Sequence, residues 1–161
     1  SSNNYGPYQY PEKIIPLFIT NLLEDKKVPV YGRGNQVRDW LFVEDHAQAI
    51  EAVLRRGEPG QIYNIGSDSR RDITNLELTQ TILKLVGRDE RMIEHVPDRP
   101  GHDLRYAINC DKLKKLGWRP AVRFTRGIKL TVDWYRSHED WWRKIKTGEY
   151  LKYYRKQYGA K

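Results

Sequence analysis

The chain has 161 residues, a length that fits one domain with a buried core, and its 29 Lys and Arg against 21 Asp and Glu give a formal net charge of +8. An aromatic content of 12% is too high for an intrinsically disordered chain. No apolar run reaches the roughly 20 residues of a membrane span, and a single cysteine excludes an internal disulfide.

The start of the chain indicates its setting. It opens on Ser1 and has neither the basic segment nor the apolar segment of a secretory signal. Together with the lone Cys110, this favours a reducing, cytoplasmic location. Segment 3–7 is turn-like and no initiator methionine precedes it, so we expect the chain to be cut from a longer protein.

The first part of the chain predicts one amphipathic helix and two short strands. Residues 14–23 carry apolar side chains at the spacing of one helix face, and Pro16 suits the first helical turn. Residues 28–31 are extended, and a glycine turn follows them. The apolar run 40–43 is typical of a buried strand.

A second helix is expected after this run, with Asp45 as its N-cap and Gly57 as its end. Its inward face is predicted to carry Ala47, Ile50, Val53 and Leu54. Residues 61–65, which are rich in β-branched and aromatic side chains, predict a strand.

Local signals continue into the next segment. Thr74 and Glu77 have the spacing of a capping box, and the helix that they begin is expected to end at Gly87. Residues 92–96 predict a further strand. The following residues, 97–102, hold two prolines and a glycine, so they predict a loop.

The last third of the chain is predicted to be helical and basic. A short helix ends at Gly117, and Thr125 is expected to cap the next one. The tail 141–158 is aromatic and basic and also favours a helix. Residues 111–161 hold 15 Lys and Arg against 5 Asp and Glu, whereas residues 1–110 are nearly neutral.

Strands alternate with helices, which indicates the α/β class. The strands are few and short, so we expect a mixed α+β lobe and not a full doubly wound sheet. Residues 1–161 are expected to form one lobe, with the candidate ligand contacts in 1–110 and a helical, basic region in 111–161. Since the contacts lie in the neutral part, the basic tail is expected to form a solvated face or to meet an acidic surface.

No complete active site is visible in the sequence. The Gly32-x-Gly34 turn lacks the third glycine of a dinucleotide fingerprint. The chain contains no Tyr-x-x-x-Lys pair, no Gly-x-Ser-x-Gly elbow and no phosphate loop. Its four histidines show no metal-binding spacing, so we predict no metal site and no catalytic residue within this chain.

Three features suit an anionic ligand, and each has an ordinary alternative. Arg38 follows a glycine turn, where a guanidinium can grip a phosphate; the alternative is a solvated side chain or a local pair with Asp39. The stiff loop around Arg99 and His102 offers donors, or is a charged turn. Tyr31 can stack on a base, or be half-buried like many tyrosines.

Several motifs follow one another in an order that is typical of one family. They are Asn3-Asn4-Tyr5-Gly6-Pro7, Pro11-Glu12-Lys13-Ile14-Ile15-Pro16, Pro29-Val30-Tyr31-Gly32, Val37-Arg38-Asp39-Trp40, Tyr63-Asn64-Ile65-Gly66, Thr74-Asn75-Leu76-Glu77 and Asp98-Arg99-Pro100-Gly101-His102-Asp103. Over essentially its whole length the chain resembles the dTDP-glucose 4,6-dehydratases, which are extended short-chain dehydrogenase/reductase enzymes. The second and the last motif point to the dehydratases. The first motif and the pattern Tyr31-Gly32-x-Gly34-x-x-x-Arg38-Asp39 are shared with sister epimerases and decarboxylases.

The resemblance implies which residues form the site. Asn3 matches the position that contacts the nicotinamide of NAD. The implied substrate contacts are Asn4, Lys13, Ile14, Pro29, Val30, Tyr31, Arg38, Asn75, Asp98, Arg99, Pro100, Gly101 and His102. Among them, Arg38, Asn75 and Arg99 match groups that hold the pyrophosphate, and Tyr31 matches the segment along the nucleotide.

The resemblance also implies what lies outside this chain. Such enzymes begin with an NAD-binding Rossmann half, which carries the Tyr-x-x-x-Lys pair and an Asp/Glu pair for dehydration. NAD takes a hydride from sugar C4, water leaves across C5–C6, and the hydride returns to C6. We expect this chain to be the substrate-binding half for dTDP-glucose, inactive alone, with the Rossmann half as its partner in a homodimer. No membrane or nucleic-acid partner is expected.

Three alternatives stay open at this point. The chain can belong to a sister nucleotide-sugar epimerase or decarboxylase. It can be a basic nucleic-acid-binding module, since its charge and its tyrosines are compatible with one, although no motif that reads RNA or DNA occurs. It can also be a non-catalytic partner that completes an active site with a separately encoded Rossmann chain.

Overall fold

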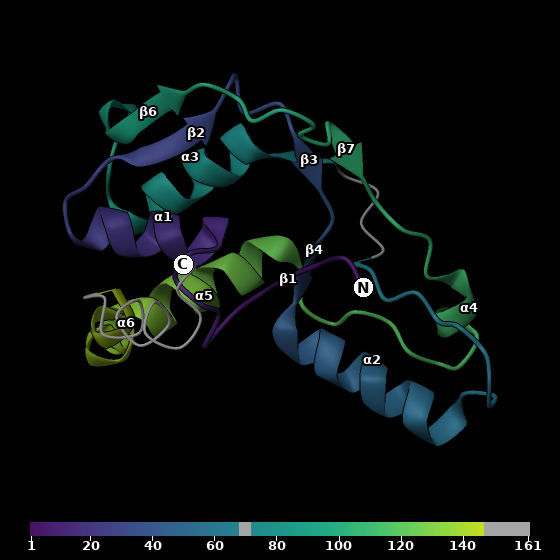
Figure 1. The fold of residues 1–161 in the computed structure, drawn as a ribbon. Coiled ribbons are helices and arrows are strands. Elements are labelled where there is room, and N and C mark those ends of the chain that lie inside the picture. Colours follow the sequence, from purple (N-terminus) through teal and green to yellow (C-terminus); the bar gives the residue numbers. More distant parts are fainter. Residues whose placement is uncertain (68–71, 147–161) are drawn as a thin grey trace, which may run out of the picture.

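The structure is a computed structural model that describes residues 1–67 and 72–146 (Figure 1). The helices are α1 (Ile14–Leu23), α2 (Val43–Arg56), α3 (Asn75–Val86), α4 (Asp111–Lys114), α5 (Phe124–Ser137) and α6 (Glu139–Lys146), with a 3-10 turn at Glu90–Met92. The strands are β1 (Asn3–Tyr5), β2 (Val28–Tyr31), β3 (Val37–Arg38), β4 (Trp40–Phe42), β5 (Ile73–Thr74), β6 (Ile93–Val96) and β7 (Arg105–Tyr106). The predicted mixed α/β class is confirmed.

The strands form three small sheets in place of one large sheet. β1 and β4 pair in parallel, with Asn3 opposite Trp40, and β2 and β6 also pair in parallel. The third sheet has the order β5-β3-β7, so β3 lies at its centre. This pairing places Arg38 on β3 opposite Tyr106 on β7, although the two residues are far apart in the sequence.

The main core lies where α1, α3 and α5 meet (Figure 1). Its fully buried side chains are Ile15, Ile19 and Leu22 from α1, Leu78 and Ile82 from α3, and Ile128 and Tyr135 from α5. A second, smaller cluster lies between β4, α2 and α4 and includes Leu41, Ala49 and Leu113. The strands β1, β2 and β4 contribute side chains to these two clusters.

Local signals account for α1 and α3. α1 has the predicted bounds. α3 begins at the predicted capping box, in which the Glu77 N–H donates to Thr74 Oγ1 (3.1 Å) and the Thr74 N–H donates to Glu77 Oε2 (2.9 Å). The helix ends at Gly87, whose φ of +81° is a conformation that glycine adopts without strain.

The N-terminus of α2 differs from the prediction. The helix begins at Val43, and Asp45 does not cap it. Instead the buried Asp45 carboxylate accepts hydrogen bonds from the backbone N–H groups of Ala121 (2.9 Å) and Val122 (3.0 Å). Asp45 thus joins α2 to the segment that leads into α5, a contact that no local pattern could indicate.

The predicted inward face of α2 was also wrong. Three of its four residues are exposed: Ala47, Ile50 (44%) and Leu54 (81%). Val53 packs at the edge of the second cluster, and the buried face consists of Ala49 and Ala52 with Asp45. The helix therefore has two apolar stripes, and the stripe of small side chains is the buried one because it allows close packing against β4.

Three shorter predictions also need correction. Residues 3–5, expected in a turn, form β1. Residues 61–65 form no strand, because no described strand lies alongside them; their link to the sheet is the hydrogen bond from Ser2 N–H to Ile65 O (2.9 Å). α5 begins before Thr125, so Thr125 is not its cap. β6 and α4 form where strand and helix were predicted.

The described part of the basic tail packs as α6. Trp142 is fully buried and donates from Nε1 to Tyr135 O (2.8 Å). Lys146 Nζ lies 2.8 Å from Glu24 Oε2, and Arg143 Nη1 lies 3.4 Å from Glu24 Oε1. One acidic contact of the tail is therefore Glu24, at the end of α1. The predicted tail helix beyond Lys146 lies outside the described residues.

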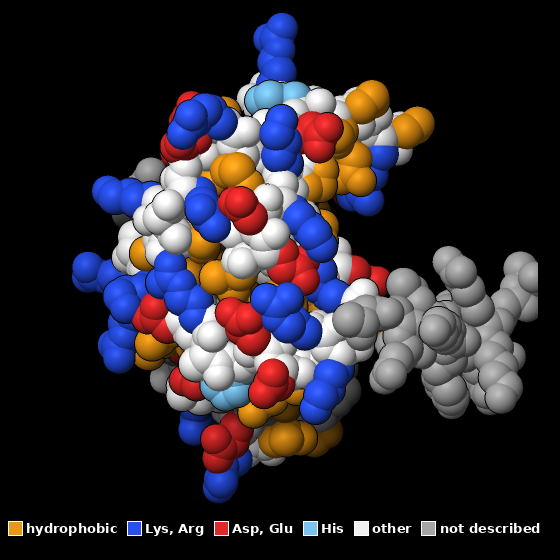
Figure 2. Space-filling view, turned by 90° about the vertical axis from the view of Figure 1, so that its left-hand side faces the viewer, with side chains coloured by type: hydrophobic (Ala, Val, Ile, Leu, Met, Phe, Trp, Pro, Cys, Tyr) orange, Lys and Arg blue, Asp and Glu red, His pale blue; other side chains and the backbone are white. Residues whose placement is uncertain are grey.

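The surface shows charge of both signs. On the face in Figure 2, Asp and Glu side chains lie among the Lys and Arg side chains and interrupt them. Such a face lacks the continuous basic stripe that is typical of a nucleic-acid-binding surface. Among the helices described within 1–67 and 72–146, none has the length and apolar character needed to cross a membrane.

Replacing Glu24 with Gln should loosen α6. Burial opposes ionisation of Glu24, but hydrogen bonds from Lys146 and Lys26 outweigh it and hold the pKa of this carboxyl below its usual value. A pKa lowered by folding contributes stability above the unfolded-state pKa, and this stability is lost as pH falls through the folded-state pKa. We expect E24Q to lower the free energy of unfolding by about 1–2 kcal/mol at pH 7, measured by urea unfolding.

The matched control is Glu51→Gln, which breaks the exposed pair of Glu51 with Arg55 on α2. An exposed pair of this kind contributes less than about 0.5 kcal/mol. The E24Q effect should vanish below the folded-state pKa of Glu24. Equal effects of E24Q and E51Q at pH 7 would contradict the role given to Glu24.

Candidate functional site

A cavity of about 440 Å³ brings together most of the predicted binding residues. Ten of the fourteen line it: Asn3, Lys13, Ile14, Pro29, Val30, Tyr31, Arg38, Asn75, Arg99 and His102. The other four, Asn4, Asp98, Pro100 and Gly101, are not part of its lining. The lining comes from β1, α1, β2, β3, the first residue of α3 and the loop after β6, so the fold gathers segments that are distant in the sequence.

Six lining residues were not predicted: Glu12, Leu17, Phe18, Trp40, Asp103 and Tyr106. Leu17 and Phe18 lie three and four positions after Ile14 on α1, so helical spacing could have found them. Tyr106 joins the site through the pairing of β7 with β3. No sequence spacing reveals such a pairing.

Arg38 is the central charge of the site. Its guanidinium donates from Nη1 to Val37 O (2.7 Å) and from Nη2 to Asp103 O (2.8 Å), and it lies 4.6 Å from the centre of the Tyr106 ring. Arg38 is 8% exposed, and no carboxylate among the described residues pairs with it. A buried, unpaired cation is costly, so its presence in a cavity wall favours an anionic ligand.

Both alternative interpretations of Arg38 are excluded. Burial rules out a solvated surface arginine. Asp39, the proposed local partner, is engaged elsewhere: its carboxylate accepts from the backbone N–H of Ser67 (3.2 and 3.3 Å to its two oxygens) and from the Ser67 hydroxyl.

Asn75, the first residue of α3, lines the cavity beside this charge. The first N–H groups of α3 are bonded within the fold: the Leu76 N–H donates to Gly34 O (3.0 Å) and the Glu77 N–H to Thr74 Oγ1 (3.1 Å). The backbone N–H of Asn75 donates to Gln36 O (2.9 Å). Asn75 Oδ1 is buried without a hydrogen-bond partner within the described ranges, so the side chain is not committed to the fold.

The loop between β6 and β7 is organised around Asp98. Asp98 Oδ1 accepts from the Arg99 N–H (2.9 Å) and from His102 Nδ1 (2.7 Å), and Oδ2 accepts from Gln36 Nε2 (2.7 Å). The hydrogen bond with His102 is the main reason why the pKa of the Asp98 carboxyl lies below its usual value. Asp98 does not line the cavity itself, but it orients Arg99 and His102, which do.

Tyr31 and Lys13 lie at more open positions of the cavity. The Tyr31 ring is exposed and meets His102 edge to face, with 5.9 Å between ring centres. Lys13 forms the exposed ion pair with Glu12 (3.0 Å) that its sequence position suggests. An exposed aromatic face beside donors suits a base, and an exposed pair contributes little to stability, so both side chains can turn to a ligand.

The remaining predicted contacts serve the shape of the backbone. Asn4 lies on β1, and its carbonyl accepts from Gln9 Nε2 (2.8 Å). Pro100 and Gly101 form the exposed turn of the loop, where Gly101 has a φ of +68°. Since none of the three lines the cavity, the geometry brings them near the site but not onto it.

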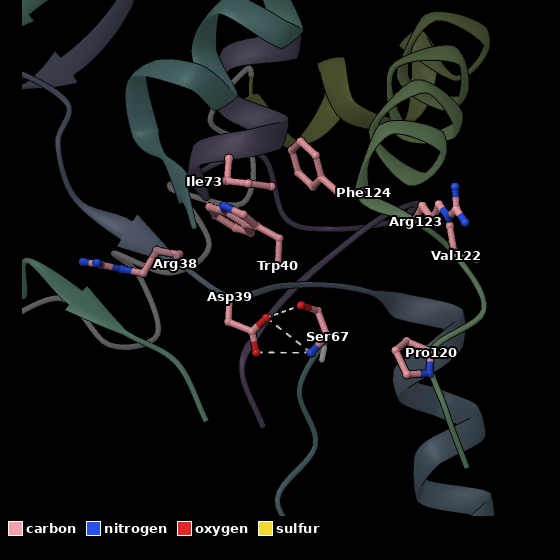
Figure 3. A pocket seen from close by; sticks show the side chains of 9 residues that line it. All are labelled: Arg38, Asp39, Trp40, Ser67, Ile73, Pro120, Val122, Arg123 and Phe124. Atoms are coloured by element: carbon pink, nitrogen blue, oxygen red, sulfur yellow. Dashed lines mark hydrogen bonds between the residues drawn. The ribbon is translucent and has the colours of Figure 1, made fainter. Parts of the chain in front are cut away.

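A second cavity of about 210 Å³ lies beside the first, and Arg38 and Trp40 line both; Figure 3 shows the smaller one. Figure 3 shows the Asp39 carboxylate turned to Ser67, while the Arg38 side chain extends away from them. The Trp40 indole Nε1 is buried without a partner among the described residues. Arg38 therefore lies in the wall between the two cavities, and Arg123 is a second cation that lines the smaller one.

The described residues offer little to a cofactor or a metal. Asn3 lines the cavity from β1, and its buried Oδ1 has no partner within the described part, so it suits a hydrogen-bond donor such as a carboxamide. The Gly32-x-Gly34 turn instead joins β2 to β3, and Gly34 packs against Val30 and Leu76. The chain thus fits NAD with one contact and not with a whole site. No group of metal-ligating side chains occurs in 1–67 or 72–146.

Comparison with curated proteins gives relatives that are dTDP-glucose 4,6-dehydratases. A family model described as GDP-mannose 4,6 dehydratase matches residues 1–131. The dTDP-glucose 4,6-dehydratase of Streptomyces niveus is 50% identical over 147 residues, which cover 91% of this chain and 43% of that protein. The chain thus spans less than half the length of the curated relatives that it matches.

Solved structures agree with this result. The dTDP-glucose 4,6-dehydratase of Bacillus anthracis, in complex with NAD, has a TM-score of 0.84 and 50% identity, over 89% of this chain and 45% of that one. The enzyme of the same name from Streptomyces venezuelae, with NAD and TYD bound, has a TM-score of 0.86 and 47% identity, over 89% and 44%. The resemblance seen in the motifs is confirmed, and the chain belongs to the GDP-mannose 4,6 dehydratase family, with dTDP-glucose 4,6-dehydratases among its relatives.

Proposed function

We propose that this chain binds the dTDP-sugar substrate of a dTDP-glucose 4,6-dehydratase. The observation that carries the proposal is Arg38, a buried guanidinium without a carboxylate partner among the described residues, in the wall of a cavity of suitable size. Relatives that bear this enzyme name at 47–50% identity support the choice of the dehydratase over its sister enzymes.

Different lining residues contact different parts of the ligand. Arg38, Arg99 and the Asn75 side chain hold the diphosphate, because two cations and an amide together suit two negative groups. Tyr31 lies against the thymine. Lys13 and Ile14 flank the sugar at the start of α1. Asn4, Asp98, Pro100 and Gly101 support these contacts through the backbone and the loop.

The reaction converts dTDP-glucose to dTDP-4-keto-6-deoxyglucose and water. NAD, contacted by Asn3 in this chain, would supply the hydride acceptor for sugar C4 and the hydride donor for C6, so no net oxidant would be consumed. The chain described here binds and orients the nucleotide end of the substrate, and Asn3 contacts the nicotinamide. The acid–base Tyr and Lys and the acidic pair belong to the Rossmann half, so this chain alone is inactive.

This chain offers a suitable docking surface for its proposed partner, the Rossmann half. The outer stripe of α2, formed by Ala47, Ile50 and Leu54, is apolar and exposed, and Ile62 in the neighbouring extended segment is exposed as well. Contiguous apolar surface of this kind is typical of an interface. Residues 61–64, which lie beside no described strand, can pair with a further strand. The intact protein is proposed to be a cytoplasmic homodimer.

Charges placed on the α2 stripe should prevent this docking. The double variant Ile50→Asp, Leu54→Asp is expected to fold like the original chain, because exposed substitutions change stability by less than about 0.5 kcal/mol. It should no longer associate with a Rossmann half supplied as a separate chain, measured by size-exclusion chromatography. The control is Leu130→Asp, which charges an exposed leucine on α5. Equal association of both variants would contradict the docking surface.

Calorimetric titration of the chain with dTDP tests the binding proposal. We expect saturable binding that is tighter than for inorganic pyrophosphate, because Tyr31 adds a contact with the base. Lack of binding to dTDP would refute the proposal, and tighter, salt-dependent binding of a random oligonucleotide would favour a nucleic-acid-binding module.

Product analysis tests the reaction class. With a Rossmann half added, dTDP-glucose should yield the 4-keto-6-deoxy sugar, whereas a C4 epimer would identify a sister epimerase. Turnover of dTDP-glucose by the 161-residue chain alone would contradict the assignment of the catalytic residues to the other half.

A further inference from the structure

Gln36 connects two parts of the cavity wall without lining the cavity. It is 5% exposed and lies between the turn after β2 and the start of β3. Its side-chain Nε2 donates to Asp98 Oδ2 (2.7 Å), and its backbone carbonyl accepts from the Asn75 N–H (2.9 Å). One residue thus fastens both the loop after β6 and the first residue of α3.

The bond from Gln36 decides how Asp98 faces the cavity. Asp98 Oδ1 accepts from the Arg99 N–H and from His102 Nδ1, at 2.9 and 2.7 Å. With Gln36 on Oδ2, both carboxylate oxygens are engaged, and rotation of the carboxylate would break bonds on both sides. Arg99 and His102 line the cavity, so their placement depends on a donor that lies behind the wall.

The next two residues fix the far end of the same loop. The Val37 N–H donates to Leu104 O (2.8 Å), and Arg38 Nη2 donates to Asp103 O (2.8 Å). The loop is therefore held at its beginning by Gln36 and at its end by β3. Its beginning also has a backbone bond, from the Gly32 N–H to Val96 O (2.9 Å), so the Gln36 side chain fixes the orientation of Asp98 and not the path of the loop.

Simple filling of the core does not account for a glutamine here. Gln36 Oε1 is buried and has no hydrogen-bond partner within the described ranges, and such an orphaned acceptor destabilises a fold. An apolar side chain of the same shape would avoid that cost. The charge-assisted hydrogen bond from the Gln36 amide to Asp98 offsets this cost.

We propose that Gln36 is a positioning residue of the dTDP site. It does not touch the ligand; it holds Asp98, and through Asp98 it holds Arg99 and His102 in the arrangement that binds the diphosphate. This inference deepens the proposed function and rests on it for the identity of the ligand. The preorganised loop is expected to bind with less loss of conformational freedom than a loose one.

An exchange of donor and acceptor tests the proposal in the 161-residue chain. Gln36→Glu places a carboxylate against Asp98, so dTDP affinity should fall about tenfold, and the NMR signals of the Arg99 amide and the His102 ring should shift without ligand. In the double variant Q36E/D98N, the new amide at position 98 donates to the new carboxylate at position 36. The double variant should then bind dTDP more tightly than Q36E, and the loop signals should move back toward those of the original chain, a recovery that general destabilisation would not produce.

The matched control is Gln80→Glu, because Gln80 Nε2 also donates to a carboxylate, Glu90 Oε1 (2.7 Å), but at an exposed position away from the cavity. Q80E should leave dTDP affinity unchanged. The proposal is overturned if Q36E keeps the affinity and the loop signals of the original chain, or if the double variant binds no better than Q36E. If the original chain does not bind dTDP, the proposed function fails, and the ligand-free signals alone decide the role of Gln36.

Discussion

Replacing Arg38 with Met is expected to lower the affinity for dTDP about 100-fold. The guanidinium is held by two backbone carbonyls and by the face of Tyr106, so it is oriented before a ligand arrives. A charge-assisted contact in a protected site contributes about 2–3 kcal/mol, and each tenfold change in affinity corresponds to 1.4 kcal/mol. Because no carboxylate in the described part of the chain neutralises Arg38, a diphosphate meets its full charge.

Calorimetric titration with dTDP measures this effect, and the unfolding free energy separates it from misfolding. We expect R38M to change stability by less than about 1 kcal/mol, because loss of the bonds to Val37 O and Asp103 O is offset by removal of a buried charge. Arg55→Met, which removes an exposed arginine on α2, is the control and should bind dTDP normally. An R38M variant that binds dTDP as the original chain does would refute the anion site.

The same arginine shows how far the sequence leads. A glycine turn followed by Arg38 suggested a phosphate contact, but from the residues alone a solvated arginine or a local pair with Asp39 was the favoured interpretation. Motif resemblance named Arg38, Asn75 and Arg99 as one group, and the fold places all three at one cavity. The decisive facts, burial and the lack of a carboxylate partner among the described residues, arise from strand pairing with β7 and cannot be read from spacing.

Elements with strong local signals were predictable, and long-range choices were not. α1 and the capping box of α3 follow from apolar spacing and from a bond between Thr74 and Glu77, three positions apart. The buried face of α2 depends instead on which of two apolar stripes meets β4. Gln36 was missed for the same reason, since its partner Asp98 lies 62 positions away.

Asp45 is the clearest long-range case, and replacing it with Ala is expected to lower the free energy of unfolding by about 2–4 kcal/mol. Its buried carboxylate accepts from the N–H groups of Ala121 and Val122, which the variant would leave without a partner. Each buried, unsatisfied group costs about 1–3 kcal/mol. The Asp45 charge also acts on Tyr5 in the core. Burial is the main cause that raises the pKa of the Tyr5 hydroxyl well above its usual value, and the Asp45 charge adds to it.

Thermal unfolding should show this as a fall of roughly 10 °C in Tm for a chain of this size. Glu44→Ala is the matched control, because Glu44 is an exposed acidic residue in the same first turn of α2. Both variants lose one negative charge near the positive end of the helix, so a pure helix-dipole role predicts similar, small effects of about 0.3–1 kcal/mol. A large loss of stability for Asp45→Ala alone is expected only if its hydrogen bonds join α2 to the segment before α5. Equal Tm values for the two variants would contradict this role.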